Sequence, residues 1–169
     1  MQSPSFDIQV GGAEANVAVG LAHLGHATTM ISAVPDNALG RGAVSSIRAH
    51  GVDCKKVQIR DGRMGLYFLA QGAGLRASEI VYDRLGSSFA QATAADFDWD
   101  ELLAHAQMLH LSGITPALGM QSSEAALAAA QARQPGRVPV RARQRVLPLP
   151  FCRSRRVPRR RAAQPARCA

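Results

Sequence analysis

The chain has 169 residues, a formal net charge of +8 and three cysteines. That length suffices for one domain of common size, and the cysteines have neither the spacing of a zinc site nor the even number of a disulfide framework. The N-terminal stretch lacks the charged start and apolar core of a signal peptide, and no apolar run reaches the length of a membrane span. These features favour a soluble protein of the reducing cytoplasm with no membrane partner.

The positive charge is confined to the C-terminal end of the chain. Residues 1–133 contain nine Lys and Arg and all 12 Asp and Glu, a net charge of −3, whereas residues 134–169 contain 11 Arg and no acid, a net charge of +11. A strongly basic protein usually has a nucleic-acid or membrane-surface partner. Here that indication applies only to the tail.

Strand and helix patterns alternate in the first part of the chain. Small and apolar residues at helical spacing predict a helix over residues 13–25, which Gly25 ends. Next come a β-branched strand at 27–34, a turn at 35–37, a helix over about 40–50, and a strand at 52–59 with one exposed face. This alternation is typical of α/β proteins with a largely parallel sheet.

The middle of the chain predicts a hairpin and then another strand–helix unit. Two short strands, residues 64–70 and 78–84, are joined by a glycine-containing loop. Asp96, Asp98 and Asp100 gather at the start of a helix over residues 98–106, where carboxylates cap free amides, and we favour capping over catalysis there. A buried strand at 108–114 and an alanine-rich helix at 122–133, capped by Ser122 or Ser123, complete the pattern.

Residues 134–169 show none of this regularity. They contain six prolines, no acid, one aromatic and no sustained period of 3.6 or 2, which predicts a disordered or poorly packed tail. The abrupt change of composition after Arg133 is typical of coding sequence translated out of frame. We therefore predict two parts, a folded part over residues 1–133 and a frameshift-derived tail over 134–169.

The glycine-rich opening carries a recognisable pattern. A Gly-Gly pair precedes a helix with an early Asn, a Leu-Gly ends that helix, and an Asp-x-x-x-Gly turn follows the next strand; the residues are Gly11, Gly12, Asn16, Leu24, Gly25, Asp36 and Gly40. This pattern resembles the first signature region of the ribokinase-like (PfkB) sugar kinases. "MGLYFLA", "IVYDRLGSS" and "LHLSGITPAL" are more narrowly similar to the 2-keto-3-deoxygluconate kinases. The resemblance runs from about residue 9 to residue 133.

The resemblance implies a partial Rossmann-like ribokinase fold with a small β-hairpin lid, and a sugar acid such as 2-keto-3-deoxygluconate as the substrate. The substrate-binding positions that it implies are Gly11, Gly12, Asn16, Tyr67, Tyr82, Arg84 and Ile114. Glycines permit close approach of a hydroxyl-rich ligand, the amide of Asn16 can both donate and accept, and the guanidinium of Arg84 suits a carboxylate.

Each of these positions also has a purely structural interpretation. The glycines could form only a strand-to-helix turn. Arg84 could be a solvated arginine paired with Asp83 or Glu79. Ile114, at the end of a strand, could belong to the core. The five histidines show no clustering, so we interpret them as surface or core residues and expect no metal site.

The second signature of the resembled family, Asp-Thr-x-Gly-Ala-Gly-Asp, does not occur in these 169 residues, and the last acid is Glu124. In the family that stretch supplies an anion hole and the base for phosphoryl transfer from ATP with Mg²⁺. We therefore assign no catalytic residue, expect the ATP and Mg²⁺ sites to be missing, and predict a truncated kinase that is inactive alone.

Two other functions stay open. The basic tail could bind nucleic acid through phosphates without sequence specificity, since it has a single stacking aromatic, Phe151. Alternatively, the chain could be a non-catalytic sugar-binding fragment that forms a homodimer through the 64–84 hairpin, as lids in the resembled family often do.

Overall fold

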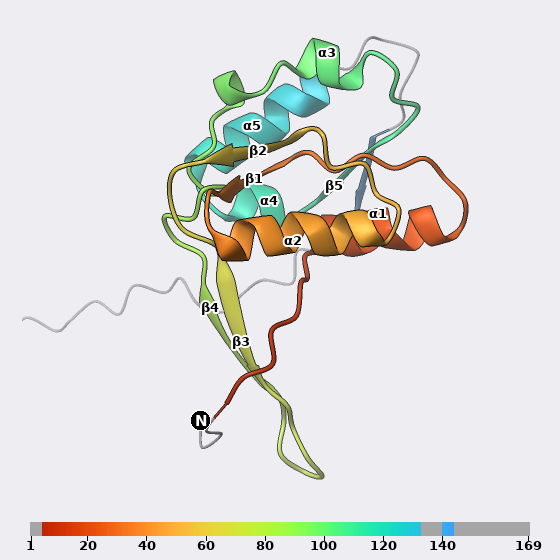
Figure 1. The fold of residues 1–169 in the computed structure, drawn as a ribbon. Helices are drawn as coiled ribbons and strands as arrows, with labels where there is room; N and C mark the ends of the chain where they lie inside the picture. Colours follow the sequence, from red (N-terminus) through yellow and green to blue (C-terminus); the bar gives the residue numbers. More distant parts are fainter. Residues whose placement is uncertain (1–4, 133–139, 144–169) are drawn as a thin grey trace, which may run out of the picture.

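The computed structural model describes residues 5–132 and 140–143. Figure 1 shows a body of helices around short strands, with a long hairpin projecting from it. In chain order the elements are α1 (Ala13–His23), β1 (Ser32–Pro35), α2 (Ala38–Ala49), β2 (Val57–Arg60), β3 (Leu66–Ala70), β4 (Glu79–Asp83), the 3₁₀ turn η1 (Ala94–Asp96), α3 (Trp99–Leu103), β5 (Leu109–Ser112), α4 (Ile114–Ala117), α5 (Met120–Gln131) and β6 (Val140–Arg143).

Two parallel strand pairs lie in the body. β1 pairs with β2, Ser32 opposite Val57, and β5 pairs with β6, Leu109 opposite Val140. Helix α2 connects the first pair, and α4 with α5 connects the second, because parallel neighbours need a crossover of this kind. α2 packs on β1, and α1 on β5. The predicted α/β fold is confirmed.

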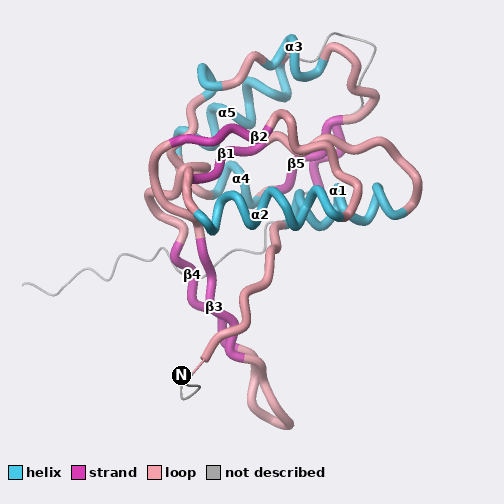
Figure 2. The backbone as a smooth tube through the Cα atoms, in the orientation of Figure 1, coloured by secondary structure: helices cyan, strands magenta, loops and turns pink. Residues whose placement is uncertain are grey.

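The hairpin predicted at residues 64–70 and 78–84 is also confirmed. β3 and β4 are antiparallel, with Tyr67 opposite Tyr82, and they extend away from the body (Figure 2). Arg63 closes the base of the hairpin: its guanidinium donates to Asp83 Oδ1 at 2.7 Å and to the carbonyl of Leu85 at 3.0 Å. The hairpin is thus tied to its own base by a forked ion pair.

The N-terminus of α2 lies in close contact with the end of β1. The side-chain oxygen of Asn37 accepts from the amides of Leu39 at 3.0 Å and Gly40 at 3.1 Å, which caps the helix. A Cβ on Gly40 would lie 2.0 Å from the carbonyl oxygen of Pro35, so only glycine fits there. The helix starts slightly before the predicted residue 40, and β1 includes Pro35.

Two small apolar clusters form the core. One joins Leu103, Leu109 and Ala129, and the other joins Ala33, Ala92 and Phe97. Trp99 packs against both clusters, with its ring centroid 4.9 Å from that of Phe97. Within the described ranges, no helix combines the length and apolar character that a bilayer crossing needs.

Of the three aspartates predicted to cap a helix start, Asp98 caps α3 and Asp96 takes part in the capping box of η1. Asp98 accepts from the amide of Glu101 at 3.0 Å at the start of α3. Asp96 accepts from the amide of Thr93 at 2.7 Å and from Arg60 at 2.9 Å. The bond from the Thr93 amide and the bond from Arg60 together lower the pKa of Asp96.

The predicted serine cap of the alanine-rich helix is wrong. α5 begins earlier, at Met120, with Gly119 at the cap position and no side-chain capping bond. Ser122 therefore lies inside the helix, is buried, and donates from its hydroxyl to the carbonyl of Ala90 at 3.3 Å. Its hydroxyl joins α5 to the loop between β4 and η1, and it has the hydrogen-bond partner that a buried hydroxyl requires.

The structure describes only four residues of the predicted tail. Residues 140–143 form β6, which differs from the expectation of no regular structure after Arg133. The free edge of β5 offers unpaired backbone groups that an extended segment can satisfy. The rest of the predicted tail lies outside the described residues.

Candidate functional site

The start of α1 meets the hairpin at Gly11. A Cβ at this position would lie 3.1 Å from the hydroxyl of Tyr67, so a larger residue would displace that side chain. Gly12 is the N-cap of α1, and its carbonyl accepts from the amide of Asn16 at 2.8 Å. The glycine pair thus lies at the junction between the body and β3.

Tyr67, Tyr82 and Arg84 form one aromatic–cationic cluster on the hairpin. The two ring centroids are 6.2 Å apart, and the guanidinium carbon of Arg84 lies 4.4 Å from the Tyr82 ring centroid and 5.7 Å from that of Tyr67. Cation–π contacts hold a guanidinium in place while leaving its N–H groups free for an anion.

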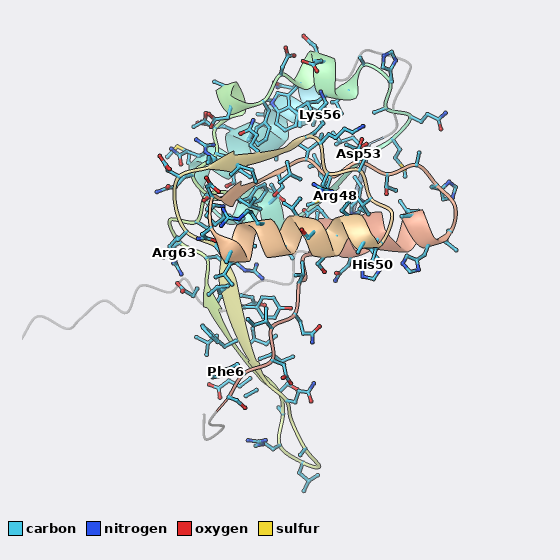
Figure 3. The ribbon with its side chains drawn as sticks, viewed as in Figure 1. Phe6, Arg48, His50, Asp53, Lys56 and Arg63 are labelled. Carbon is cyan, nitrogen blue, oxygen red and sulfur yellow. The ribbon has the colours of Figure 1, made fainter. Side chains whose placement is uncertain are left out.

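Arg84 makes no ion pair within residues 5–132. Of the two partners that the sequence suggests, Asp83 is bound by Arg63 instead, and that hydrogen bond lowers the pKa of the Asp83 carboxyl. Figure 3 labels Arg63 beside the base of the hairpin. The charge of Arg84 is therefore not neutralised by the neighbouring acid in sequence.

Glu14 is a site residue that the sequence analysis missed. Its Oε1 atom accepts three hydrogen bonds: from the amide of Ser112 at 3.1 Å, from the hydroxyl of Ser112 at 2.6 Å, and from the hydroxyl of Thr115 at 2.7 Å. The hydroxyl of Ser112 in turn accepts from the amide of Ile114 at 3.2 Å. One carboxylate thus joins the first turn of α1 to the end of β5.

Burial raises the pKa of Glu14, but its bonds from Ser112 and Thr115 together outweigh burial, and the net pKa lies below the ordinary value. The sequence signal was an acid in the first turn of a helix, which ordinarily indicates only a favourable interaction with the helix dipole. The partners are nearly 100 residues away, so sequence spacing could not reveal them.

A hollow of about 2150 Å³, partly open to solvent, extends over much of the described fold. Its lining includes the predicted positions Gly11, Gly12, Tyr67, Arg84 and Ile114, together with Glu14. Asn16 is exposed on α1, and neither it nor Tyr82 lines the hollow. The hollow is far larger than the roughly 300–1,000 Å³ of a closed small-molecule site. It is therefore not a single enclosed small-molecule pocket.

The expectation that the histidines do not cluster is wrong for two of them. Nε2 of His23 and Nδ1 of His50 lie 3.2 Å apart. The two residues stand at the ends of different helices, 27 positions apart in the chain, so the tertiary fold brings them together. In the part of the chain that the structure describes, no group of three or more His, Cys, Asp or Glu side chains could hold a metal ion.

A family model for the "pfkB family carbohydrate kinase" matches residues 1–149. The chain belongs to this family. The pfkB match includes both glycines at the start of α1, the hairpin, and strands β5 and β6. The family resemblance seen in the sequence motifs is therefore confirmed.

Individual pfkB relatives agree with this assignment. The chain is 35% identical over 114 residues to a 2-dehydro-3-deoxygalactonokinase of Haloferax volcanii, covering 68% of this chain and 36% of that protein. The crystal structure of a 2-dehydro-3-deoxygluconokinase of Thermotoga maritima superposes with a TM-score of 0.79 at 39% identity, covering 83% of this chain and 43% of that one.

A more distant sugar kinase of Pyrococcus horikoshii, solved in complex with ATP, shares the fold, with a TM-score of 0.69 at 22% identity; the match covers 78% of this chain and 42% of that one. The chain thus spans well under half the length of these relatives.

Proposed function

We propose that residues 1–133 form the sugar-binding part of a pfkB kinase for a sugar acid such as 2-keto-3-deoxygluconate. The observation that carries this proposal is Arg84, which lies over Tyr67 and Tyr82, lines the open hollow, and makes no ion pair with Asp83 or Glu79. A neutral sugar offers a guanidinium only uncharged hydroxyl acceptors, whereas a carboxylate accepts a forked, charge-assisted pair from it. The names of the similar Haloferax and Thermotoga kinases agree with this substrate class.

The other predicted positions take supporting roles in this proposal. Gly11 and Gly12 let the ligand approach the start of α1, and Asn16 offers its exposed amide beside them. Ile114, held through Ser112 by Glu14, forms the apolar wall at the end of β5. Tyr82 does not line the hollow, and its ring instead packs against the guanidinium of Arg84 and orients it.

Replacing Arg84 by Ala is expected to weaken binding of 2-keto-3-deoxygluconate by roughly 10- to 100-fold, the loss typical of hydrogen bonds to a charged group. Binding of a neutral hexose, measured by the same calorimetric titration, is expected to change little. Arg48→Ala is the matched control, because Arg48 is exposed on α2 outside the hollow (Figure 3). Equal losses for acid and neutral sugar would place Arg84 outside the site.

We further propose that these 169 residues alone do not transfer phosphate. ATP and Mg²⁺, which the family uses, would bind residues that this chain does not supply. The described residues hold no cluster fit for a metal ion, and the sequence has no Gly-Ala-Gly-Asp stretch and no acid after Glu124. A base and an anion hole each lower the barrier by several kcal/mol, about 10²-fold or more in rate.

The purified chain, incubated with 2-keto-3-deoxygluconate, ATP and Mg²⁺, is expected to form no phosphosugar above the uncatalysed background. The intact Thermotoga maritima enzyme, assayed in parallel, serves as the positive control. Turnover that disappears when a residue within 1–133 is replaced would contradict the proposal, because it would show that this part contains its own catalytic machinery.

We propose a cytoplasmic protein whose sugar-binding part covers residues 1–133. Homodimerisation through the hairpin is supported by its exposed apolar side chains, among them Leu69, Leu75, Ile80 and Val81. Non-specific nucleic-acid binding and a frameshift origin both concern residues 134–169, most of which lie outside the described residues.

A further inference from the structure

Two histidines meet on the surface where α1 and α2 end. His23 lies in the last turn of α1, and His50 is the C-cap of α2. Their facing nitrogens, Nε2 of His23 and Nδ1 of His50, are 3.2 Å apart, and the ring centroids are 5.3 Å apart with planes tilted by 40°. Both side chains are exposed, and Figure 3 labels His50 at this end of α2.

The positions of the two helix ends determine the distance between the histidine rings. After each helix the chain turns at a glycine with a positive φ, Gly25 at 84° and Gly51 at 86°. The two helix ends lie close together, since a Cβ added at Gly51 would lie 3.9 Å from the Cβ of Ala22. The histidines are therefore presented from two neighbouring helix termini. Because helix C-termini carry partial negative charge, they also favour a bound cation.

We propose that His23 and His50 form a two-ligand binding site for a late first-row divalent transition-metal ion such as Ni²⁺, Cu²⁺ or Zn²⁺. Imidazole is a preferred ligand for these ions. Bonds of about 2.0–2.1 Å to a tetrahedral ion place two ligand nitrogens about 3.4 Å apart. The observed separation of 3.2 Å comes within a few tenths of an ångström of that value.

Metal binding needs a change of tautomer and a small rotation of the rings, so that both lone pairs converge on the ion. In the metal-free pair one facing nitrogen donates a hydrogen bond to the other, so one of the two carries a proton. With the metal bound, both facing nitrogens present lone pairs, and the protons lie on Nδ1 of His23 and Nε2 of His50. Within residues 5–132 no third His, Cys, Asp or Glu joins the pair, so water completes the coordination.

The site differs from the magnesium site of a kinase. Mg²⁺ prefers oxygen ligands and near-ideal octahedral geometry, which two imidazoles do not provide. The ion would act as a clamp between the ends of α1 and α2, and binding to the folded state alone would stabilise it.

The test is a calorimetric and thermal-unfolding titration of the full chain with Ni²⁺. The wild type is expected to bind one Ni²⁺ at this pair and to show a higher unfolding midpoint, and Mg²⁺ is expected to produce neither effect. Loss of a group that only hydrogen-bonds to a metal ligand already costs a metal site about 10- to 100-fold in affinity. His23→Ala and His50→Ala should each cost at least about tenfold.

His26→Ala is the matched control, because His26 is also exposed and lies only three residues from His23, outside the pair. A second measurement uses the wild type alone: Ni²⁺ should protect His23 and His50, but not His26, from acylation by diethyl pyrocarbonate, as mapped by mass spectrometry. Unchanged affinity in both His23→Ala and His50→Ala, or equal loss in His26→Ala, would overturn the proposal.

Discussion

Gly40→Ala is expected to destabilise the fold by about 2–4 kcal/mol, the range of severe steric overpacking. The added Cβ would lie 2.0 Å from the carbonyl oxygen of Pro35 and 3.1 Å from its carbonyl carbon. Neither atom belongs to a flexible side chain, so α2 and β1 would have to separate. The measurement is the free energy of unfolding from urea titration followed by circular dichroism.

Gly42→Ala provides the matched control in the same helix. A Cβ on Gly42 meets nothing within 4 Å, and alanine is a better helix former than glycine by roughly 0.5–1 kcal/mol. This variant is expected to be slightly more stable than the wild type. If both variants lost the same stability, the cause would be helix composition and not the contact between α2 and β1.

Glu14→Ala is expected to cost about 2–4 kcal/mol of stability and to weaken sugar binding. The change removes one acceptor that serves three donors on Ser112 and Thr115, and it leaves those donors to find other partners. Ser112 also holds the amide of Ile114, so the wall of the hollow should shift. Glu14→Gln keeps an acceptor oxygen and should lose clearly less, which urea titration at neutral pH would show.

The charge of Glu14 also predicts a pH dependence. Its pKa in the folded state lies below the ordinary value of 4.5, so its contribution to stability is complete above that value and is lost as the pH falls through the folded pKa. The difference in unfolding free energy between wild type and Glu14→Gln should therefore shrink on acidification below about pH 4.5. A difference that stayed constant down to acid pH would show that the carboxylate charge has no part in it.

Local patterns were reliable wherever a short segment determines its own structure. The helix ending before Gly25, the hairpin with Tyr67 opposite Tyr82, and the capping role of Asp98 all follow from neighbours within a few residues. Failures came where tertiary packing decides the outcome. Ser122 has good capping chemistry, yet its hydroxyl bonds to Ala90 in another segment because the helix begins two residues earlier.

The same division applies to the candidate site. The glycine pair, Tyr67, Tyr82 and Arg84 could be named from motifs, because family patterns are written in consecutive residues. The motifs could not predict which arginine binds Asp83. Arg84 is its neighbour in sequence, but the forked ion pair forms with Arg63 across the hairpin base. Arg84 follows the end of β4 and packs over the rings of Tyr67 and Tyr82. Arg63, which precedes β3, lies within reach of Asp83.

The sequence by itself thus determined the family, the α/β class, the hairpin and the candidate positions for a sugar acid, since these depend on local periodicity and contiguous motifs. Tertiary structure alone decided that Glu14 joins α1 to β5 and that His23 meets His50. Both contacts link residues far apart in the chain, 98 positions in the first case and 27 in the second. They form only when packed elements bring their ends together, because spacing along the chain carries no information about which helix termini become neighbours.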